Sequence, residues 1–71
     1  MNRQNAERMK ALMYDFTAKV NESLHEIKDS ESQEEFVAYR RLVARLMGAM
    51  LDVLRLVYAY HPDLEPPEPK D

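Results

Sequence analysis

Glu22 and His25 are the residues of this chain whose types and spacing come nearest to a metal site. A Glu-x-x-His pair on one helix is half of the carboxylate-bridged di-metal site found inside some four-helix bundles, where all ligands point inward. Here the apolar stripe of the same predicted helix passes through Val20, Ser23 and Ile27, so Glu22 and His25 fall on its outer face. The sequence therefore predicts a solvated polar face, with no metal site and no bound cofactor.

The chain also lacks the residues of a catalytic site. It has no cysteine, and its two histidines, His25 and His61, lie far apart in the sequence with no evident nucleophile beside either. Its only glycine is Gly48, so there is no Gly-rich loop for phosphate. A chain of 71 residues built this way encloses little concave volume for a substrate. We therefore expect a protein that is not an enzyme.

Arginines in the second half of the chain are the candidates for binding nucleic acid. They lie on or beside the one polar strip of a long apolar helix, and RNA-binding helical hairpins of this size exist. Against this interpretation, Asp52 shares the strip, the net charge is −3, and no aromatic residues are interleaved with the arginines. We favour a solvated strip and keep a nucleic-acid face as an alternative. Its residues are Arg40, Arg41, Arg45 and Arg55.

These side chains are carried by two predicted helices, the first from about residue 3 to 28. Asn2 or Asn5 can cap its start. Its apolar residues recur at spacings of three and four, which is typical of a helix that buries one stripe and keeps its other faces in water. The stripe contains Ala6, Met9, Met13, Phe16, Val20 and Ile27, with Ser23 filling one position.

The second predicted helix runs from about residue 33 to 60, after a turn at about 29–32. Ser32 and Glu35 form a capping box, and so short a loop indicates an antiparallel hairpin. Further apolar rows flank its main stripe on both sides, and the first helix can cover only one stripe. A partner should cover the excess, because monomers rarely expose large apolar patches. The main stripe contains Phe36, Tyr39, Val43, Leu46, Met50, Val53, Val57 and Tyr60.

We therefore predict an all-α protein in which residues 1–61 form an antiparallel two-helix hairpin that dimerises into a four-helix bundle. Each additional Leu-sized side chain that is buried contributes about 1.5–3 kcal/mol. The second helix has more such side chains than the first helix can cover, and burying them in a dimer should exceed the ordering cost of association. If two copies of the second helix cross near Gly48, Arg45 of one chain meets Asp52 of the other. The predicted dimer or partner interface is Val43, Met47, Met50, Leu51, Leu54 and Tyr58.

Residues 62–71 are predicted to be a disordered, acidic, Pro-rich tail. Pro62 ends the second helix, because proline disfavours helical geometry in the residue before it. The N-terminus lacks the apolar core of a signal peptide. Charged residues interrupt the most apolar segment, residues 42–60, which argues against a membrane span and a membrane partner. We expect a cytoplasmic protein.

Three functions fit these predictions. The preferred one is a small dimeric adaptor, inhibitor or regulator that binds another protein through the surface of its helical bundle. The first alternative is the nucleic-acid-binding hairpin. The second is an obligate subunit of a hetero-complex, of the chaperone or antitoxin type, whose apolar second helix is covered by a different protein. A well-folded homodimer would argue against the last of these, and a monomeric or aggregated chain would argue against the first.

Overall fold

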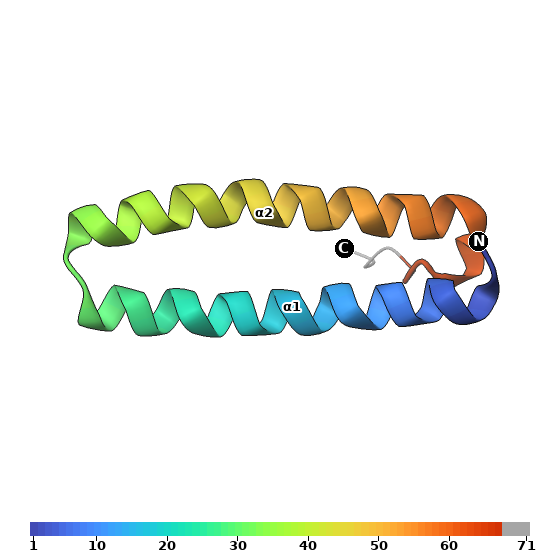
Figure 1. The fold of residues 1–71 in the computed structure, drawn as a ribbon, viewed down its shortest axis with the longest axis horizontal. Coiled ribbons are helices and arrows are strands. Elements are labelled where there is room, and N and C mark those ends of the chain that lie inside the picture. The colour runs from blue at the N-terminus through green and yellow to red at the C-terminus, as the bar shows by residue number, and fades with distance from the viewer. Residues whose placement is uncertain (68–71) are drawn as a thin grey trace.

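The computed structural model describes residues 1–67. Two antiparallel helices of 28 residues each, α1 (Arg3–Ser30) and α2 (Gln33–Tyr60), lie side by side and are joined by a tight turn (Figure 1). A single 3-10 turn, η1 (Pro62–Leu64), follows α2. The described part of the chain contains no strand. The prediction of an all-α helical hairpin is confirmed.

Side-chain caps define where both helices begin. The Asn2 side chain accepts a hydrogen bond from the Asn5 amide at 2.8 Å, and the Ser32 hydroxyl accepts one from the Glu35 amide at 3.2 Å. A side-chain hydrogen bond between Glu31 and Glu35 raises the pKa of Glu35, and the negative charge of Glu31 adds to this effect. Because α1 continues to Ser30, two residues beyond its expected end, the turn contains only residues 31 and 32.

The core between the helices differs from the predicted stripe of α2. Leu46 and Tyr60 were expected to face α1, yet they are 49% and 60% exposed, whereas Leu54 is buried. The physical reason is that α2 is apolar around most of its circumference, so spacings of three and four do not define which row faces α1. The buried side chains are Ala6 of α1 and Val43, Met50, Leu54 and Val57 of α2.

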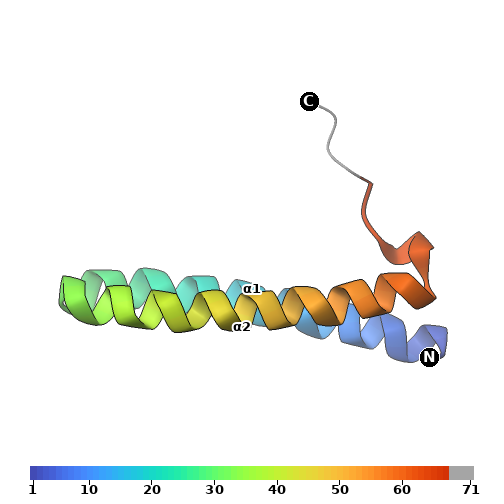
Figure 2. The same cartoon turned by 90° about the horizontal axis from the view of Figure 1, so that it is seen from above.

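The segment after α2 folds back against α1. A salt bridge of 2.6 Å joins Arg3 to Asp63, and the Lys10 ammonium donates a hydrogen bond of 2.6 Å to the Leu64 carbonyl. Residues 62–67 therefore lie on one side of the plane of the two helices (Figure 2). The sequence predicted disorder from residue 62 onward, but the structure gives this beginning of the tail an ordered turn. Residues 68–71 of that prediction lie outside the described residues.

Candidate protein-interaction face

The plane of the two helices divides the hairpin into two faces. We call the side that carries η1 the tail face and the opposite side the open face. Residues spaced three, four or seven apart share one side of a helix, which assigns each apolar row to a face. The open face contains Leu12 and Phe16 of α1 and Leu42, Leu46, Ala49, Val53, Leu56 and Tyr60 of α2.

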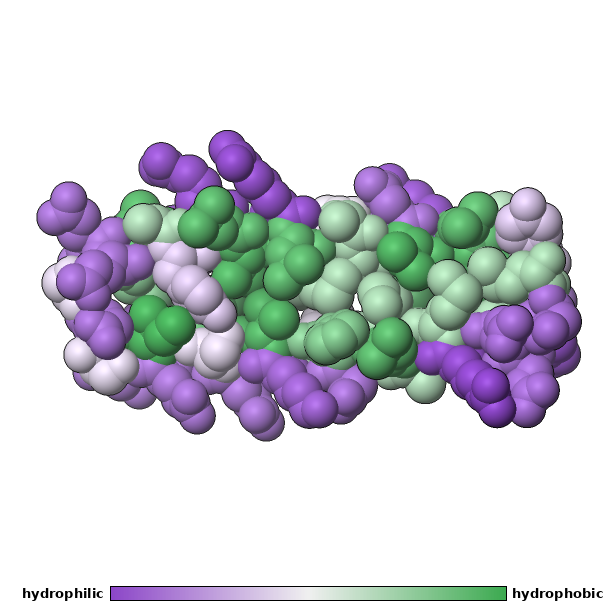
Figure 3. Space-filling view, in the orientation of Figure 1, coloured by the Kyte–Doolittle hydropathy of each residue, from purple (hydrophilic) through white to green (hydrophobic). Residues whose placement is uncertain are grey.

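The open face is apolar and accessible along most of its length. Its six large side chains other than Val53 are each between 45% and 61% exposed. Apolar side chains of both helices form one band along this side of the molecule, with charged residues at its margins (Figure 3). Contiguous apolar patches bordered by polar residues are typical of protein-interaction surfaces.

A pocket of 290 Å³ lies in the middle of the open face, between the two helices. Each side chain that lines it is apolar, so it offers no acid, base or metal ligand. A pocket of this kind accepts an apolar side chain of a partner rather than a polar substrate. Its lining residues are Met13, Phe16 and Val20 of α1 and Leu46, Ala49, Met50 and Val53 of α2.

The tail face is more polar, and the chain itself covers part of it. The hydroxyls of Tyr14 and Tyr58 form a hydrogen bond of 3.3 Å, and the Lys10 ammonium lies 5.5 Å from the centroid of the Tyr14 ring. Burial raises the pKa of Tyr58 to about 12, and the hydrogen bond from Tyr14 adds to this effect. The turn at η1 is held over this region by Lys10 and Arg3.

The structure divides the sequence-predicted interface between the core and the tail face. Val43, Met50 and Leu54 are buried between the two helices of one hairpin. Leu51 is 53% exposed, while Met47 and Tyr58 are half-buried, and all three lie toward the tail face.

The open face is the larger accessible apolar surface, and sequence reasoning did not select it as the interface. It assigned Leu46, Val53 and Tyr60 to the contact with α1 and did not include Leu42 or Leu56 in the predicted interface. No local signal separated this row from the tail-side row between Ala44 and Tyr58, because both rows are apolar over the same turns of α2.

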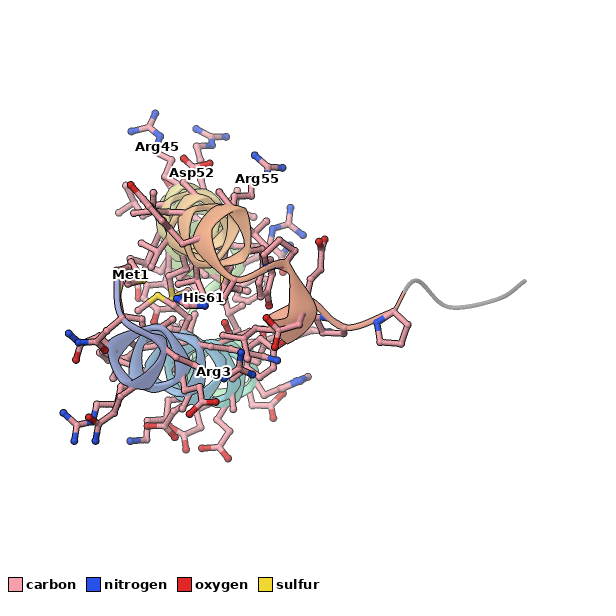
Figure 4. All side chains as sticks on the ribbon, turned by 90° about the vertical axis from the view of Figure 1, so that its right-hand side faces the viewer. Met1, Arg3, Arg45, Asp52, Arg55 and His61 are labelled. Atoms are coloured by element: carbon pink, nitrogen blue, oxygen red, sulfur yellow. The ribbon has the colours of Figure 1, made fainter. Side chains whose placement is uncertain are left out.

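The polar strip of α2 lies on the side of the helix turned away from α1. Arg45, Asp52 and Arg55 all point outward there (Figure 4). A Cβ atom added to Gly48 would meet no side chain and no other segment within 4 Å among the residues that the structure describes. Asp52, predicted to meet Arg45 of a second chain, lies 3.3 Å from Arg55 of its own chain.

The candidate nucleic-acid residues do not form one cluster of free cations. The Arg40 guanidinium lies 5.8 Å from the centroid of the Phe36 ring, and Arg55 is paired with Asp52. Arg41 and Arg45 are exposed on the polar strip. The arrangement therefore adds no observation in favour of a phosphate-binding surface.

The histidines and acidic residues also remain apart. Glu22 and His25 are both exposed on the outer side of α1, and the Nε2 atom of His61 lies 3.0 Å from the Met1 carbonyl oxygen. Among residues 1–67, no three His, Cys, Asp or Glu side chains gather in a way that could hold a metal ion. Neither α1 nor α2 is long and apolar enough to cross a bilayer.

The open face is thus the candidate functional site, and its side chains are suited to packing rather than to chemistry. Comparison of the chain with protein-family models, with curated proteins and with solved structures finds no match.

Proposed function

We propose that this chain is a non-catalytic protein-interaction module that acts as a dimer, in which a second copy covers the open face to give a four-helix bundle. The observation that supports this best is the open face itself. Six large apolar side chains, about half exposed, lie along this face, which also contains a pocket with an entirely apolar lining. A second copy brings the same apolar row, so apolar side chains of both copies can cover one another.

The area of the hairpin supports the same proposal. The chain exposes 5766 Å². A compact monomer of 8.4 kDa exposes about 4,600 Å², roughly 1,200 Å² less. A stable protein interface buries about 800 Å² on each partner. Covering the open face would therefore bring this elongated hairpin close to the exposure of an ordinary compact protein.

A dimer of this kind leaves specific surfaces free for a further protein. The two tail faces and the two polar strips of α2 point outward when the open faces are joined. They carry Leu51, the Tyr14–Tyr58 pair and the exposed Arg41. This is the surface through which an adaptor or regulator of this shape would act.

The test is the molecular mass of the purified chain in solution over a range of concentrations. Light scattering and sedimentation should give twice the chain mass of 8.4 kDa. The melting temperature should rise with protein concentration, because association stabilises the folded state by mass action. A well-folded monomer at every concentration would overturn the proposal. A molten or aggregated chain would also overturn it and would favour a heteromeric partner for α2.

A further inference from the structure

We infer that the two hairpins stack with their turns at opposite ends, so that α2 of one copy packs antiparallel on α2 of the other and crosses it at Ala49. This inference rests on the proposed function and adds the arrangement of the two copies. It follows from the spacing of the open-face residues along each helix and from which residues of α1 and α2 lie beside each other in the hairpin.

The open-face row of α2 is nearly symmetric about Ala49. Leu42 and Leu56 lie seven residues on either side of it, and Leu46 and Val53 lie three and four residues away. In an antiparallel crossing at Ala49, the Leu42 side chain of one copy therefore meets Leu56 of the other, and Leu46 meets Val53. Every position along the contact then pairs one apolar side chain with another.

Residue sizes at the centre and the ends of the row also fit this crossing. The small side chain of Ala49 would lie on the two-fold axis, which allows the two helices to approach to the usual distance of about 8–10 Å. Ala38 and Tyr60 lie eleven residues before and after Ala49, so each exposed tyrosine would pack over an alanine of the second copy. The crossing thus pairs a large side chain with a small one where the row ends.

The open side of α1 has its own centre of symmetry, and that centre lies at the same level. Leu12 and Phe16 flank residue 14 symmetrically, and the polar residues Asn5 and Ser23 are nine residues away on either side. Phe16 and Ala49 line the same pocket, so the two centres are adjacent in the hairpin. One two-fold axis at the level of the pocket therefore relates both helices to their copies, and on α1 it pairs Leu12 with Phe16 and Asn5 with Ser23.

The other two-fold stacking, with both turns at the same end, pairs the rows less well. It places α2 over α1 of the second copy. The hydroxyls of Ser23 and Tyr39 are hydrogen-bonded at 2.7 Å, so Leu42, three residues further along α2, lies near the level of Val20. Leu42 would then lie over Val20 of the second copy, between Lys19 and Ser23. A charged and a polar side chain would border this contact, whereas the antiparallel crossing places Leu42 over a leucine.

The margin of the antiparallel crossing also accommodates the interchain pair predicted from the sequence. Arg45 and Asp52 lie four residues before and three residues after Ala49. Both are exposed beside the open-face row, and Asp52 holds only one exposed partner, Arg55, in its own chain. In the crossing, Arg45 of each copy comes level with Asp52 of the other.

The chain has no cysteine, so single cysteines can report the arrangement directly. Ala49→Cys places two thiols on the two-fold axis, and Gly48→Cys is the matched control on the polar strip, where added atoms meet nothing within 4 Å. Under mild oxidation the Ala49→Cys chain should form a disulfide-linked dimer at least about tenfold faster than Gly48→Cys, because a disulfide requires close Cβ atoms. A mixture of Ala38→Cys and Tyr60→Cys chains should give a mixed disulfide as a second measurement.

The outcomes separate this inference from the proposed function. If the unmodified chain is a dimer by mass but neither Ala49→Cys nor the mixed pair cross-links, the antiparallel crossing is wrong and the stacking of α2 on α1 replaces it. If Gly48→Cys cross-links as fast as Ala49→Cys, the copies meet through the polar strip, which also overturns the inference. A monomeric unmodified chain overturns the proposed function itself.

Discussion

On the tail face the chain covers part of its own apolar surface, whereas on the open face it leaves that surface uncovered. Lys10 and Arg3 hold η1 in place on the tail face through the Leu64 carbonyl and Asp63. The row from Leu42 to Tyr60 on the open face has no charged side chain with which to hold a segment of its own chain. The same two helices therefore present one face that is partly covered through polar contacts and one that only another apolar surface can cover.

This difference arises because so short a chain has few segments with which to cover its two helices. A hairpin of two helices has a single seam, and the five buried side chains among residues 1–67 all lie along that seam. The only further element described is a turn of three residues, which reaches one face. In our proposal, a second copy provides for the open face what η1 provides for the tail face.

The largest expected effect comes from breaking the seam on which both faces depend. Leu54→Ala should lower the free energy of unfolding by about 2–5 kcal/mol, because Leu54 is buried between the helices and truncation leaves a cavity. Leu51→Ala, on the exposed tail side, should change it by less than about 0.5 kcal/mol. Urea unfolding of both variants measures the difference. Equal losses would mean that Leu51 is also buried, in the interface that the sequence predicted.

The next effect separates the two faces by charge. Leu46→Glu should weaken the dimer by about 30-fold or more, since it places a carboxylate in the centre of the open face. Leu51→Glu is the matched control, because Leu51 is similarly exposed but lies toward the tail face. Sedimentation equilibrium measures both dissociation constants. If Leu51→Glu dissociates the dimer and Leu46→Glu does not, the dimer forms through the tail face and not through the open face.

A smaller effect concerns the half-buried phenol of Tyr58 on the tail face. The pKa of Tyr58 is raised to about 12 from an ordinary value of 10. Between these two pH values the folded state holds a proton that the unfolded state has lost, so the stability contributed by Tyr58 is complete below about pH 10 and disappears toward pH 12. Thermal unfolding of the wild type should therefore show a steeper loss of stability across this range than Tyr58→Phe. Parallel pH profiles would show that the phenol is not buried.

The smallest effect concerns the exposed contact that anchors η1. The hydrogen bond from Arg3 lowers the pKa of Asp63 in the folded chain. The contact therefore stabilises the folded state fully at pH values above the ordinary pKa of an aspartate. This stabilisation is lost as the pH falls through the lowered pKa of Asp63. Arg3→Ala should return the pKa of Asp63 toward its ordinary value, measurable by NMR titration of the carboxyl carbon. Melting at neutral pH should hardly change, because exposed ion pairs contribute little. An unchanged pKa in Arg3→Ala would mean that η1 is not anchored there.

Sequence reasoning predicted the helices well and the assignment of their surfaces poorly. It identified the cap at Ser32, the antiparallel turn and the end of α2 before Pro62, because those features depend on neighbouring residues. It placed Leu46 against α1 and assigned Leu54 to a partner, and the structure reverses these positions. It had no basis for the pairing of Asp63 with Arg3, which joins residues from opposite ends of the chain.

Local physical chemistry was sufficient to determine two long helices and a short turn. The described helices contain no proline and a single glycine, and each begins at a side-chain cap. The tertiary structure alone decided which part of the apolar circumference of α2 is buried and on which side the tail lies. Both choices depend on the rotation of α2 about its own axis relative to the apolar stripe of α1. The sequence of a helix that is apolar in several rows does not determine this rotation. That rotation leaves the open face uncovered.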